Sequence, residues 1–249
     1  MNVERIALVT GANKGIGLQI AKELAAKGFT VLIGARKLQL GVAAAASLEG
    51  NARAIHLDVT DQETITAAAR YIRDTFGRLD VLVNNAGISH AGPLGRSLEE
   101  MALSGLLSIA SHEDVQSVFE TNVFGVIAVT QAMLPLLHES PAGRVVNMSS
   151  MNGSLTLNSD VSNAFRKFTG LYAISKTALN AATLAFAIEL ESTNIKVNAV
   201  CPGFTATGLN NYSGVGTVEE AAREPVRLAL LGEDGPTGAF SNADGKIPW

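Results

Sequence analysis

Cysteine, histidine and long apolar runs are scarce in this sequence. The 249 residues include a single cysteine, Cys201, so an intrachain disulfide is excluded. The four histidines are scattered along the chain, which argues against a metal site. No apolar stretch approaches the roughly 18 residues that a membrane span needs, and no segment combines a basic start, an apolar stretch and a cleavage site. These absences predict a cytoplasmic protein that neither crosses a membrane nor binds a metal.

Basic residues are also few. The chain has 19 Lys and Arg against 23 Asp and Glu, a net charge of -4, without a long basic run. A nucleic-acid or membrane-surface protein would normally present a cationic face, so small molecules are the expected partners. Hydrophobic residues make up 47% of the sequence. At this length that is enough for one large core, and we expect a single domain over residues 1–249.

Strand-like and helix-like segments alternate along almost the whole chain. The alternation predicts a doubly wound, Rossmann-like α/β domain, with a seven-stranded parallel sheet and helices on both faces. Two long segments at about 89–111 and 151–171 exceed this pattern, and both border the sheet edge at which ligands bind. Strands are expected at 5–10, 30–35, 52–57, 79–83, 143–148, 195–200 and 239–241, and helices at 15–27, 39–48, 61–76, 113–137, 170–192 and 217–231.

A glycine-rich turn, Thr10-Gly-Ala-Asn-Lys-Gly-Ile-Gly17, joins the first strand to the first helix. In this setting Gly11, Gly15 and Gly17 permit a tight turn, close approach of the backbone to a pyrophosphate, and close packing of helix on strand. The N-terminus of the helix supplies free N–H groups to the phosphates. Such turns also bind flavins or single nucleotides, or bind nothing, so the turn alone does not identify a ligand.

The end of the second strand lacks the acid that normally accepts hydrogen bonds from the ribose of NAD. Ala35 stands at that place, Arg36 and Lys37 follow it, and Lys14 adds a third cation from the glycine turn. A 2′-phosphate suits a guanidinium group and would be repelled by a carboxylate. The pattern favours NADP(H) over NAD(H). The alternative is that Arg36 and Lys37 are solvated residues opening a surface helix.

Tyr172 and Lys176 stand four residues apart at the start of a helical segment, so their side chains project from one face. The pKa of a tyrosine is about 10, and a nearby ammonium favours the phenolate, which brings the group nearer its working range as a proton donor. This spacing arises by accident in about one chain in ten, so the pair needs further support.

Further motifs supply that support. In chain order, the sequence contains Thr10-Gly11…Gly15-Ile16-Gly17, Leu57-Asp58-Val59, Asn84-Asn85-Ala86-Gly87, Thr121-Asn122-Val123, Val146-Asn147-Met148-Ser149-Ser150, Tyr172…Lys176 and Pro202-Gly203-Phe204-Thr205-Ala206-Thr207. With these seven motifs the chain resembles the short-chain dehydrogenase/reductase family from Arg5 to about Leu209. Lys14, Arg36, the segment 235–240 and the terminal Ile-Pro-Trp are most similar to its NADPH-dependent carbonyl reductase branch.

The resemblance implies a role for each motif. Ser150, in preference to Ser149, would hydrogen-bond the substrate carbonyl, and Tyr172 would donate the proton. Lys176 would lower the pKa of the tyrosine and bind the nicotinamide ribose, and Asn122 would hold a water in the proton path. Besides Tyr172 and Lys176, the residues implied to bind the cofactor are Gly11, Asn13, Lys14, Gly15, Ile16, Gly17, Arg36, Lys37, Asp58, Val59, Asn85, Ala86, Gly87, Pro202, Gly203, Thr205 and Thr207.

Structural alternatives remain open for several of these residues. Asn122 could bridge the backbone at a helix kink, Asn84 and Asn85 could satisfy a strand end, and Asp58 could cap the following turn instead of contacting adenine. The complete set of four implied catalytic residues, Asn122, Ser150, Tyr172 and Lys176, weighs against a chance assembly.

The segment between Ser150 and Tyr172 is longer than the dozen or so residues common in the family, and its side chains are largely apolar. Together with the lid expected after Thr207, it favours a hydrophobic ketone or aldehyde as substrate. The alternative is that these side chains only pack the insertion against the sheet. The apolar side chains concerned are Met151, Leu155, Leu157, Phe165, Phe168, Leu209 and Tyr212.

Taken together, the motifs predict a carbonyl reductase that uses NADPH and works as a monomer or small homo-oligomer, with the monomer favoured. The first alternative is a secondary-alcohol dehydrogenase of the sterol or terpenoid type. The second, of a different class, is a non-enzymatic NADPH-binding regulator on the same scaffold, and the intact set of four catalytic residues argues against it.

Overall fold

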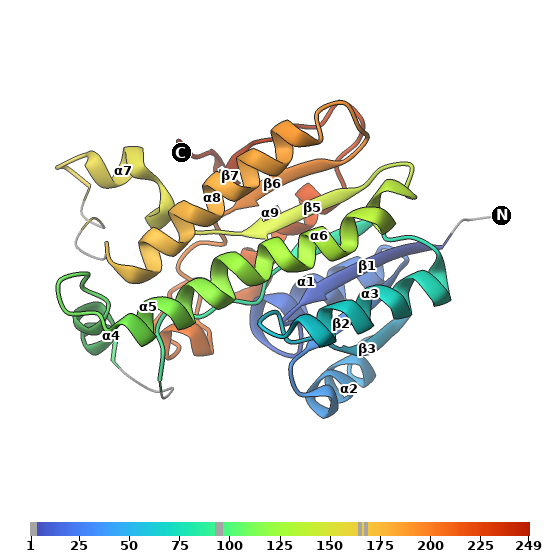
Figure 1. Ribbon diagram of the computed structural model, residues 1–249, viewed down its shortest axis with the longest axis horizontal. Coiled ribbons are helices and arrows are strands. Elements are labelled where there is room, and N and C mark those ends of the chain that lie inside the picture. Colours follow the sequence, from blue (N-terminus) through green and yellow to red (C-terminus); the bar gives the residue numbers. More distant parts are fainter. Residues whose placement is uncertain (1–3, 93–96, 164–165, 167–168) are drawn as a thin grey trace.

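A computed structural model describes residues 4–92, 97–163, 166 and 169–249. At its centre lies an eight-stranded sheet with the order β3-β2-β1-β4-β5-β6-β7-β8 (Figure 1). The first seven strands are parallel, as predicted, and β8 pairs antiparallel with β7. The strands are β1 (Arg5–Thr10), β2 (Phe29–Ala35), β3 (Ala52–His56), β4 (Val81–Asn84), β5 (Arg144–Met148), β6 (Lys196–Val200), β7 (Phe240–Asn242) and β8 (Gly245–Lys246).

The helices occupy the predicted positions within a few residues, and the two long segments add short helices of their own. The predicted helix at 113–137 is a continuous rod of α5, a π-helical turn η1 and α6. The helices are α1 (Gly15–Ala26), α2 (Leu38–Ala46), α3 (Gln62–Phe76), α4 (Leu98–Ser104), α5 (His112–Phe119), η1 (Glu120–Phe124), α6 (Gly125–His138), α7 (Leu155–Ser159), α8 (Leu171–Glu189) and α9 (Val218–Ala229), with short turns η2 (Met151–Gly153) and η4 (Gly208–Asn210).

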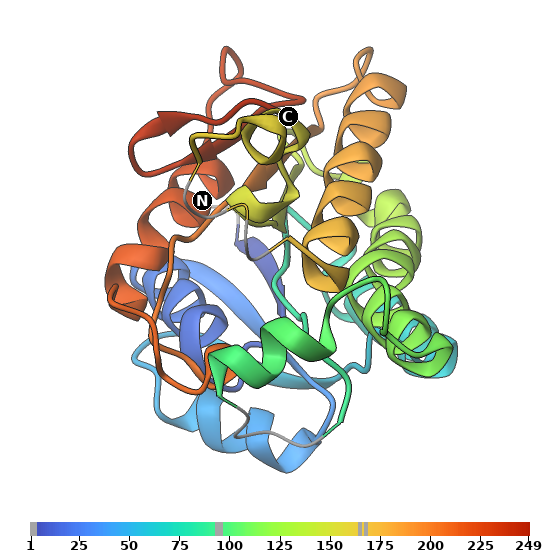
Figure 2. The same ribbon diagram turned by 90° about the vertical axis from the view of Figure 1, so that its left-hand side faces the viewer.

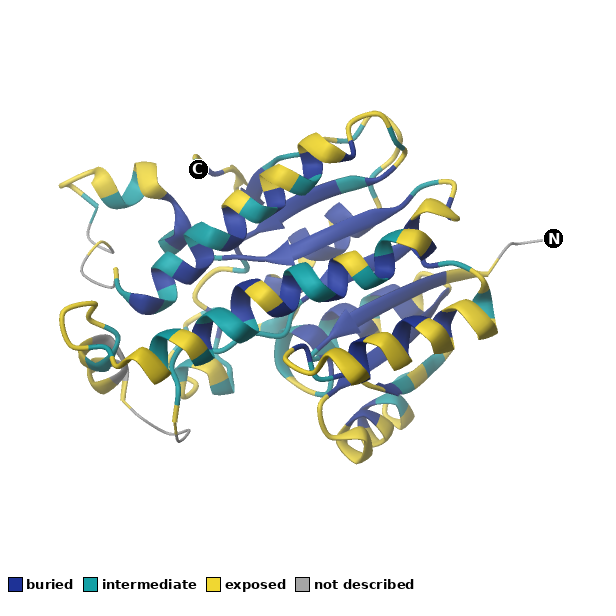
Figure 3. Ribbon diagram, in the orientation of Figure 1, coloured by how far each residue is buried: buried dark blue, intermediate teal, exposed yellow. Residues whose placement is uncertain are grey.

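Helices cover both faces of the sheet. On one face α3, α6 and α8 share a core cluster with Ile6 and Leu8 of β1, and on the other α1, α2 and α9 share one with Ala7 and Val9. Successive side chains of a strand point to opposite faces, so a strand buried on both sides needs an unbroken apolar run. The sheet is accordingly buried while the helices expose their outer sides (Figure 3). This confirms the predicted doubly wound architecture.

Two helical stretches correct one expectation from the sequence. Within the described residues, 112–138 and 171–189 are long and apolar enough to cross a membrane, each with a mean hydropathy of 1.3. Small residues and a few polar ones hid this length in the sequence. Half of each apolar window is buried inside the protein, as expected for core helices that cover a sheet.

The carboxyl ends of the parallel strands share one edge of the sheet. At β1 the strand order reverses, because β2 lies on one side of it and β4 on the other, and ligands of such sheets bind at this switch point. Figure 2 looks onto this edge, with α4 (green) and α7 (yellow) on opposite sides of it. The two long segments therefore border the place where a ligand is expected.

Candidate functional site

The glycine-rich turn after β1 packs directly on the loop after β4. Gly11 and Gly15 have positive φ values of 63° and 59°, a conformation that favours glycine. A Cβ on Gly11 would lie 3.0 Å from Ala86 Cα, and a Cβ on Gly17 would overlap the side-chain amide of Asn85. Both positions therefore need glycine if the turn is to lie this close to its neighbour.

The N-terminus of α1 is open for an anion. Its N-cap residue, Lys14, makes no side-chain capping hydrogen bond, and no acidic residue stands in the first turn. The first N–H groups of a helix have no acceptor within the helix, and together with the helix dipole they attract phosphate. This uncapped start beside the tight glycine turn fits the pyrophosphate of a dinucleotide.

Cations gather at the same edge. Arg36 and Lys37 are exposed after the end of β2, and in the described part of the chain their side chains form no hydrogen bond or ion pair. Ala35 is fully buried, and its Cβ lies 3.1 Å from the position that a Cβ on Gly41 of α2 would take. The side chain of Ala35 thus faces α2, which leaves Arg36 as the first exposed residue after the strand.

Lys14 belongs to the glycine turn, and its side chain extends towards the loop after β6. A Cβ on Gly208 would lie 3.7 Å from Lys14 Nζ, and a Cβ on Gly15 would lie 3.7 Å from Thr207 Cγ2. The loop around Thr207 therefore rests against the turn that the sequence assigns to the cofactor.

Two of the residues expected to contact the adenosine part of the cofactor also form hydrogen bonds within the protein. Asp58 Oδ1 accepts hydrogen bonds from Thr60 N at 3.0 Å and Thr60 Oγ1 at 2.8 Å, which is the capping alternative. Asn85 Nδ2 donates to Thr10 O at 2.8 Å and so ties the β4 loop to the glycine turn. Asn13, Ile16, Val59, Ala86, Gly87, Pro202, Gly203 and Thr205 likewise follow carboxyl ends of strands.

Ser150, Tyr172 and Lys176 come together beside this edge. The side chain of Ser150 lies beside the Tyr172 hydroxyl, close enough to lower the pKa of that phenol. Lys176 Nζ lies 5.6 Å from the centroid of the Tyr172 ring and donates to Met148 O at 2.8 Å. A Cβ on Gly153 would lie 2.8 Å from Lys176 C, so this glycine allows the turn after Ser150 to pack on α8.

The neighbouring serine has a different environment. Ser149 is 3% exposed, and its Oγ donates to Asn180 Oδ1 at 2.5 Å. Ser150 is only partly buried and faces Tyr172. Of the two serines, Ser150 is the one whose side chain affects the pKa of the tyrosine.

Burial governs the ionisation of the pair. It raises the pKa of Tyr172, negative charge on the nearby Cys201 sulfur raises that pKa further, and the side chain of Ser150 opposes the rise. Burial lowers the pKa of Lys176 to about 8. The sequence had led us to expect a lowered tyrosine pKa from the ammonium, whereas desolvation is the largest effect on both groups.

Asn122 occupies the π-helical turn between α5 and α6. Its Nδ2 donates to Ile88 O at 2.8 Å and to Ser175 Oγ at 3.0 Å, and its Oδ1 accepts from Ile88 N at 2.9 Å. Ser175 Oγ in turn donates to Tyr172 O at 2.7 Å. The amide therefore bridges backbone, as the structural alternative foresaw, and it joins the β4 loop to the first turn of α8.

The apolar side chains of the long segments divide into two groups. Met151 and Leu157 pack with Trp249 against a small core around Phe240. For these two side chains the structure agrees with the alternative that they pack the insertion against the sheet. Leu155 and Tyr212 are 66% and 71% exposed, and Leu209 is partly exposed. Phe165 and Phe168 lie outside the described residues.

Cys201 is a member of the site that the sequence did not single out. It is buried, burial raises the pKa of its thiol, and the backbone N–H groups of Gly203 and Met151 oppose that rise. The sequence feature that could have identified it is its position between the end of β6 and Pro202-Gly203.

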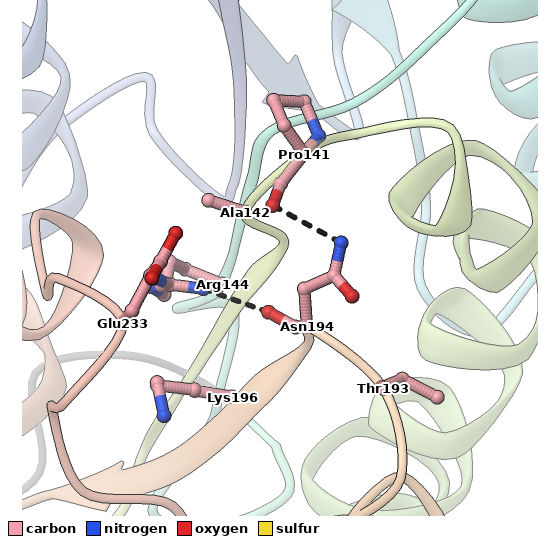
Figure 4. A pocket seen from close by; sticks show the side chains of 7 residues that line it. All are labelled: Pro141, Ala142, Arg144, Thr193, Asn194, Lys196 and Glu233. Atoms are coloured by element: carbon pink, nitrogen blue, oxygen red, sulfur yellow. Dashed lines mark hydrogen bonds between the residues drawn. The ribbon is translucent and has the colours of Figure 1, made fainter.

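A separate hollow of about 330 Å³ lies at the opposite, amino edge of β5 and β6 (Figure 4). Arg144 on its wall is 3% exposed and donates to the carbonyl groups of Gly143, Asn194, Leu231 and Gly232 at 2.7 to 3.2 Å. Because all its donors are used, Arg144 fastens the end of α9 to the sheet, and this hollow lies away from the residues described above.

Comparison with known proteins agrees with this arrangement. The family model for short chain dehydrogenase matches residues 5–215. The chain is 34% identical to (-)-isopiperitenone reductase from Mentha piperita, covering 97% of each chain, and 34% identical to (+)-neomenthol dehydrogenase from Arabidopsis thaliana, covering 95% of each. The crystal structure of an NADPH-bound carbonyl reductase from chicken fatty liver superimposes with a TM-score of 0.80 at 28% identity, covering 99% of each chain.

A family match over most of the chain, two relatives of similar length and a shared fold lead to one conclusion. The chain belongs to the short-chain dehydrogenase/reductase family, oxidoreductases that interconvert carbonyl and alcohol groups with a nicotinamide cofactor.

Proposed function

We propose that the protein is an NADPH-dependent carbonyl reductase that reduces a hydrophobic ketone or aldehyde to the alcohol. The observation that carries the proposal is the approach of the Ser150 side chain to the Tyr172 hydroxyl, with Lys176 one helical turn further along α8. The three groups stand at the same sheet edge as the glycine turn. A carbonyl carbon that accepts hydride needs hydrogen-bond donors at its oxygen and a proton source within reach, and this group offers both.

Each residue has a distinct task in this chemistry. A bound nicotinamide supplies the hydride. The hydroxyl groups of Ser150 and Tyr172 hydrogen-bond the substrate oxygen as negative charge develops on it, and Tyr172 transfers its proton to the alkoxide. Burial raises the pKa of Tyr172, which keeps the phenol protonated at neutral pH and suits reduction. The Lys176 ammonium then stabilises the phenolate that remains.

Asn122 is proposed as a positioning residue. Through Ile88 and Ser175 it holds the β4 loop against the helix turn of Tyr172. Gly87 stands beside this junction, because a Cβ there would lie 3.2 Å from Asn122 Oδ1 and 3.6 Å from Lys176 Nζ. A glycine at this point leaves room for the ribose next to Lys176.

The preference for NADPH rests on the cations. Arg36 and Lys37 are exposed where the chain leaves β2, and no carboxylate stands at the end of that strand. A doubly charged 2′-phosphate would gain charge-assisted hydrogen bonds there. Similarity to the NADPH-bound carbonyl reductase from chicken fatty liver supports the same choice.

An apolar substrate is favoured by the rim of the site. Leu103, Leu107, Ile109 and Leu155, on the two long segments, have exposed side chains. A rim of this kind stabilises a hydrophobic ketone more than a sugar or an acid.

Tyr172→Phe tests the mechanism. With saturating NADPH and a panel of aromatic, cyclic and aliphatic ketones, we expect turnover to fall by about 10²-fold or more, because the variant has no proton to donate. NADPH binding, measured by fluorescence, should be kept. Tyr71→Phe, at a partly exposed tyrosine of α3, is the control and should behave as wild type. Full turnover in Tyr172→Phe would refute the mechanism.

Oxidation of a secondary alcohol is the second candidate, since one relative is named a (+)-neomenthol dehydrogenase. The same residues would act in reverse, with Tyr172 as the base. Its raised pKa makes oxidation faster at alkaline pH than at neutral pH. An alcohol panel with NADP⁺ at both pH values separates the two directions, and tight NADPH binding without turnover in either would favour a regulator.

A further inference from the structure

The two long segments meet through their backbones immediately before Tyr172. Gly105 follows α4 in the first segment, and Gly170 ends the second. The N–H of Leu171 donates to Gly105 O at 2.8 Å. A Cβ on Gly170 would lie 2.5 Å from Gly105 O and 3.2 Å from Gly105 C. Only glycine at position 170 therefore allows this approach.

The contact caps the helix that carries the proposed proton donor. The first N–H groups of a helix lack partners within it, and a side chain at the N-cap usually accepts one of them. Here the N-cap is Gly170, which has no side chain, and the carbonyl of Gly105 accepts the hydrogen bond from Leu171. The backbone of one pocket-bordering segment thus replaces the missing cap.

The first turn of α8 is held from two directions. Gly105 binds Leu171 at its start, and Asn122 binds Ser175, whose hydroxyl donates to Tyr172 O. Tyr172 lies between these two attachments. A shift of either attachment moves the phenol relative to Ser150.

We propose that Gly170 is a positioning residue, which through Gly105 couples the segment 97–110 to the placement of Tyr172 against Ser150. The proposal rests on the proposed function for its catalytic consequence, whereas the coupling itself is a property of the fold. The segment 97–110 exposes Leu103, Leu107 and Ile109, so an apolar molecule bound against it acts on the same attachment.

Gly170→Ala tests the coupling by steric displacement. Gly232→Ala is the matched control, because a Cβ there meets nothing within 4 Å. Hydrogen–deuterium exchange should rise in both 97–110 and 170–176 for Gly170→Ala and in neither for Gly232→Ala. Unchanged exchange in 170–176 would overturn the coupling. This readout requires no catalytic activity.

Leu171→Pro provides a second test that adds no atom at position 170. Proline removes the N–H that Gly105 accepts and is tolerated at the first position of a helix. Leu171→Ala loses the same buried side chain and keeps the N–H, so it measures the cost of lost packing alone. Exchange in 97–110 should rise for Leu171→Pro above the level of Leu171→Ala. Equal exchange in the two variants would overturn the proposal.

Kinetics separate positioning from simple pocket contact. Small displacements of reacting groups cost up to about 10²-fold, so Gly170→Ala should lose about tenfold or more in kcat on small and large ketones alike, with an unchanged KM for NADPH. A loss confined to KM for large ketones would overturn the positioning role. If wild type reduces no carbonyl while the exchange results hold, the proposed function fails and the coupling stands.

Discussion

Replacing Lys176 by methionine should stabilise the protein near neutral pH while abolishing its activity. Lys176 is 5% exposed, and burial lowers its pKa from the ordinary 10.5 to about 8. Among the residues that the structure describes, its Nζ donates one hydrogen bond, to Met148 O. Methionine has a similar length without the charge, so the variant keeps most of the packing and avoids burying an ammonium.

The size of the effect follows from the pKa. A fall from 10.5 to about 8 corresponds to about 3 kcal/mol, since one pKa unit is worth about 1.4 kcal/mol. Loss of the charge-assisted hydrogen bond from Lys176, which leaves Met148 O without its donor, costs about 2 kcal/mol. We therefore expect Lys176→Met to raise the free energy of unfolding by about 1 kcal/mol near pH 7.

The sign of the pH dependence is also determined. The pKa of Lys176 is lower in the folded protein than in the unfolded chain, so between about 8 and 10.5 the unfolded chain holds more protons. The cost of burial is complete below the folded pKa and disappears as the pH rises towards the unfolded pKa. When the pH rises from about 7 to about 9, the free energy of unfolding of wild type should increase by about 1 kcal/mol relative to that of the variant.

Urea unfolding at these two pH values, without cofactor, measures both quantities. Above this range the raised pKa values of Cys201 and Tyr172 add contributions of opposite sign, so the comparison stops there. Lys246→Met, at an exposed lysine of β8, is the control and should leave the pH dependence of wild type unchanged. A variant less stable than wild type at neutral pH, or a stability difference that does not narrow by about pH 9, would refute the reasoning.

Two further predictions concern cations at opposite edges of the sheet. Arg36→Ala should raise KM for NADPH by about ten- to hundredfold and leave KM for NADH unchanged, because the lost guanidinium would contact only the 2′-phosphate. Lys22→Ala on α1 is the control. An equal rise in KM for both cofactors would contradict the assignment. Arg144→Met should lower the free energy of unfolding by about 2–4 kcal/mol, because it leaves buried carbonyl groups without a donor. Urea unfolding measures this loss, activity per folded molecule should be unchanged, and wild-type stability would show that the hydrogen bonds to Leu231 and Gly232 contribute little.

Local pattern was sufficient for most of the fold. The strand at 5–10 is continuously apolar from Ile6 to Val9 because both faces of β1 are covered. Gly77 ends α3 with a φ of 75°, a left-handed conformation that glycine adopts readily at helix ends. The strand β8 was missed because it has only two residues, too few for any period to show. Asp244-Gly245, a dipeptide frequent in tight turns, was its only signal.

From the sequence, the location of the candidate site could be predicted better than the contacts within it. Motifs placed after parallel strands must meet at the carboxyl edge, and the family resemblance paired Ser150 with Tyr172 there. The hydrogen-bond partners of Asn122 could not be predicted, because they depend on a π-helical turn that places its amide beside Ile88 and Ser175. A single extra residue in a helical turn leaves no clear periodic trace.

By itself the sequence determined the architecture, the family and the edge at which its chemistry-bearing residues gather, since these follow from hydrophobic period, glycine placement and motif order. Only the tertiary structure decided the state of those residues. Burial set the direction of the pKa of Tyr172 and of Lys176, and the approach of Gly105 to Gly170 capped the helix that carries them. Desolvation and backbone contact depend on neighbours that are distant along the chain, and no local pattern contains them.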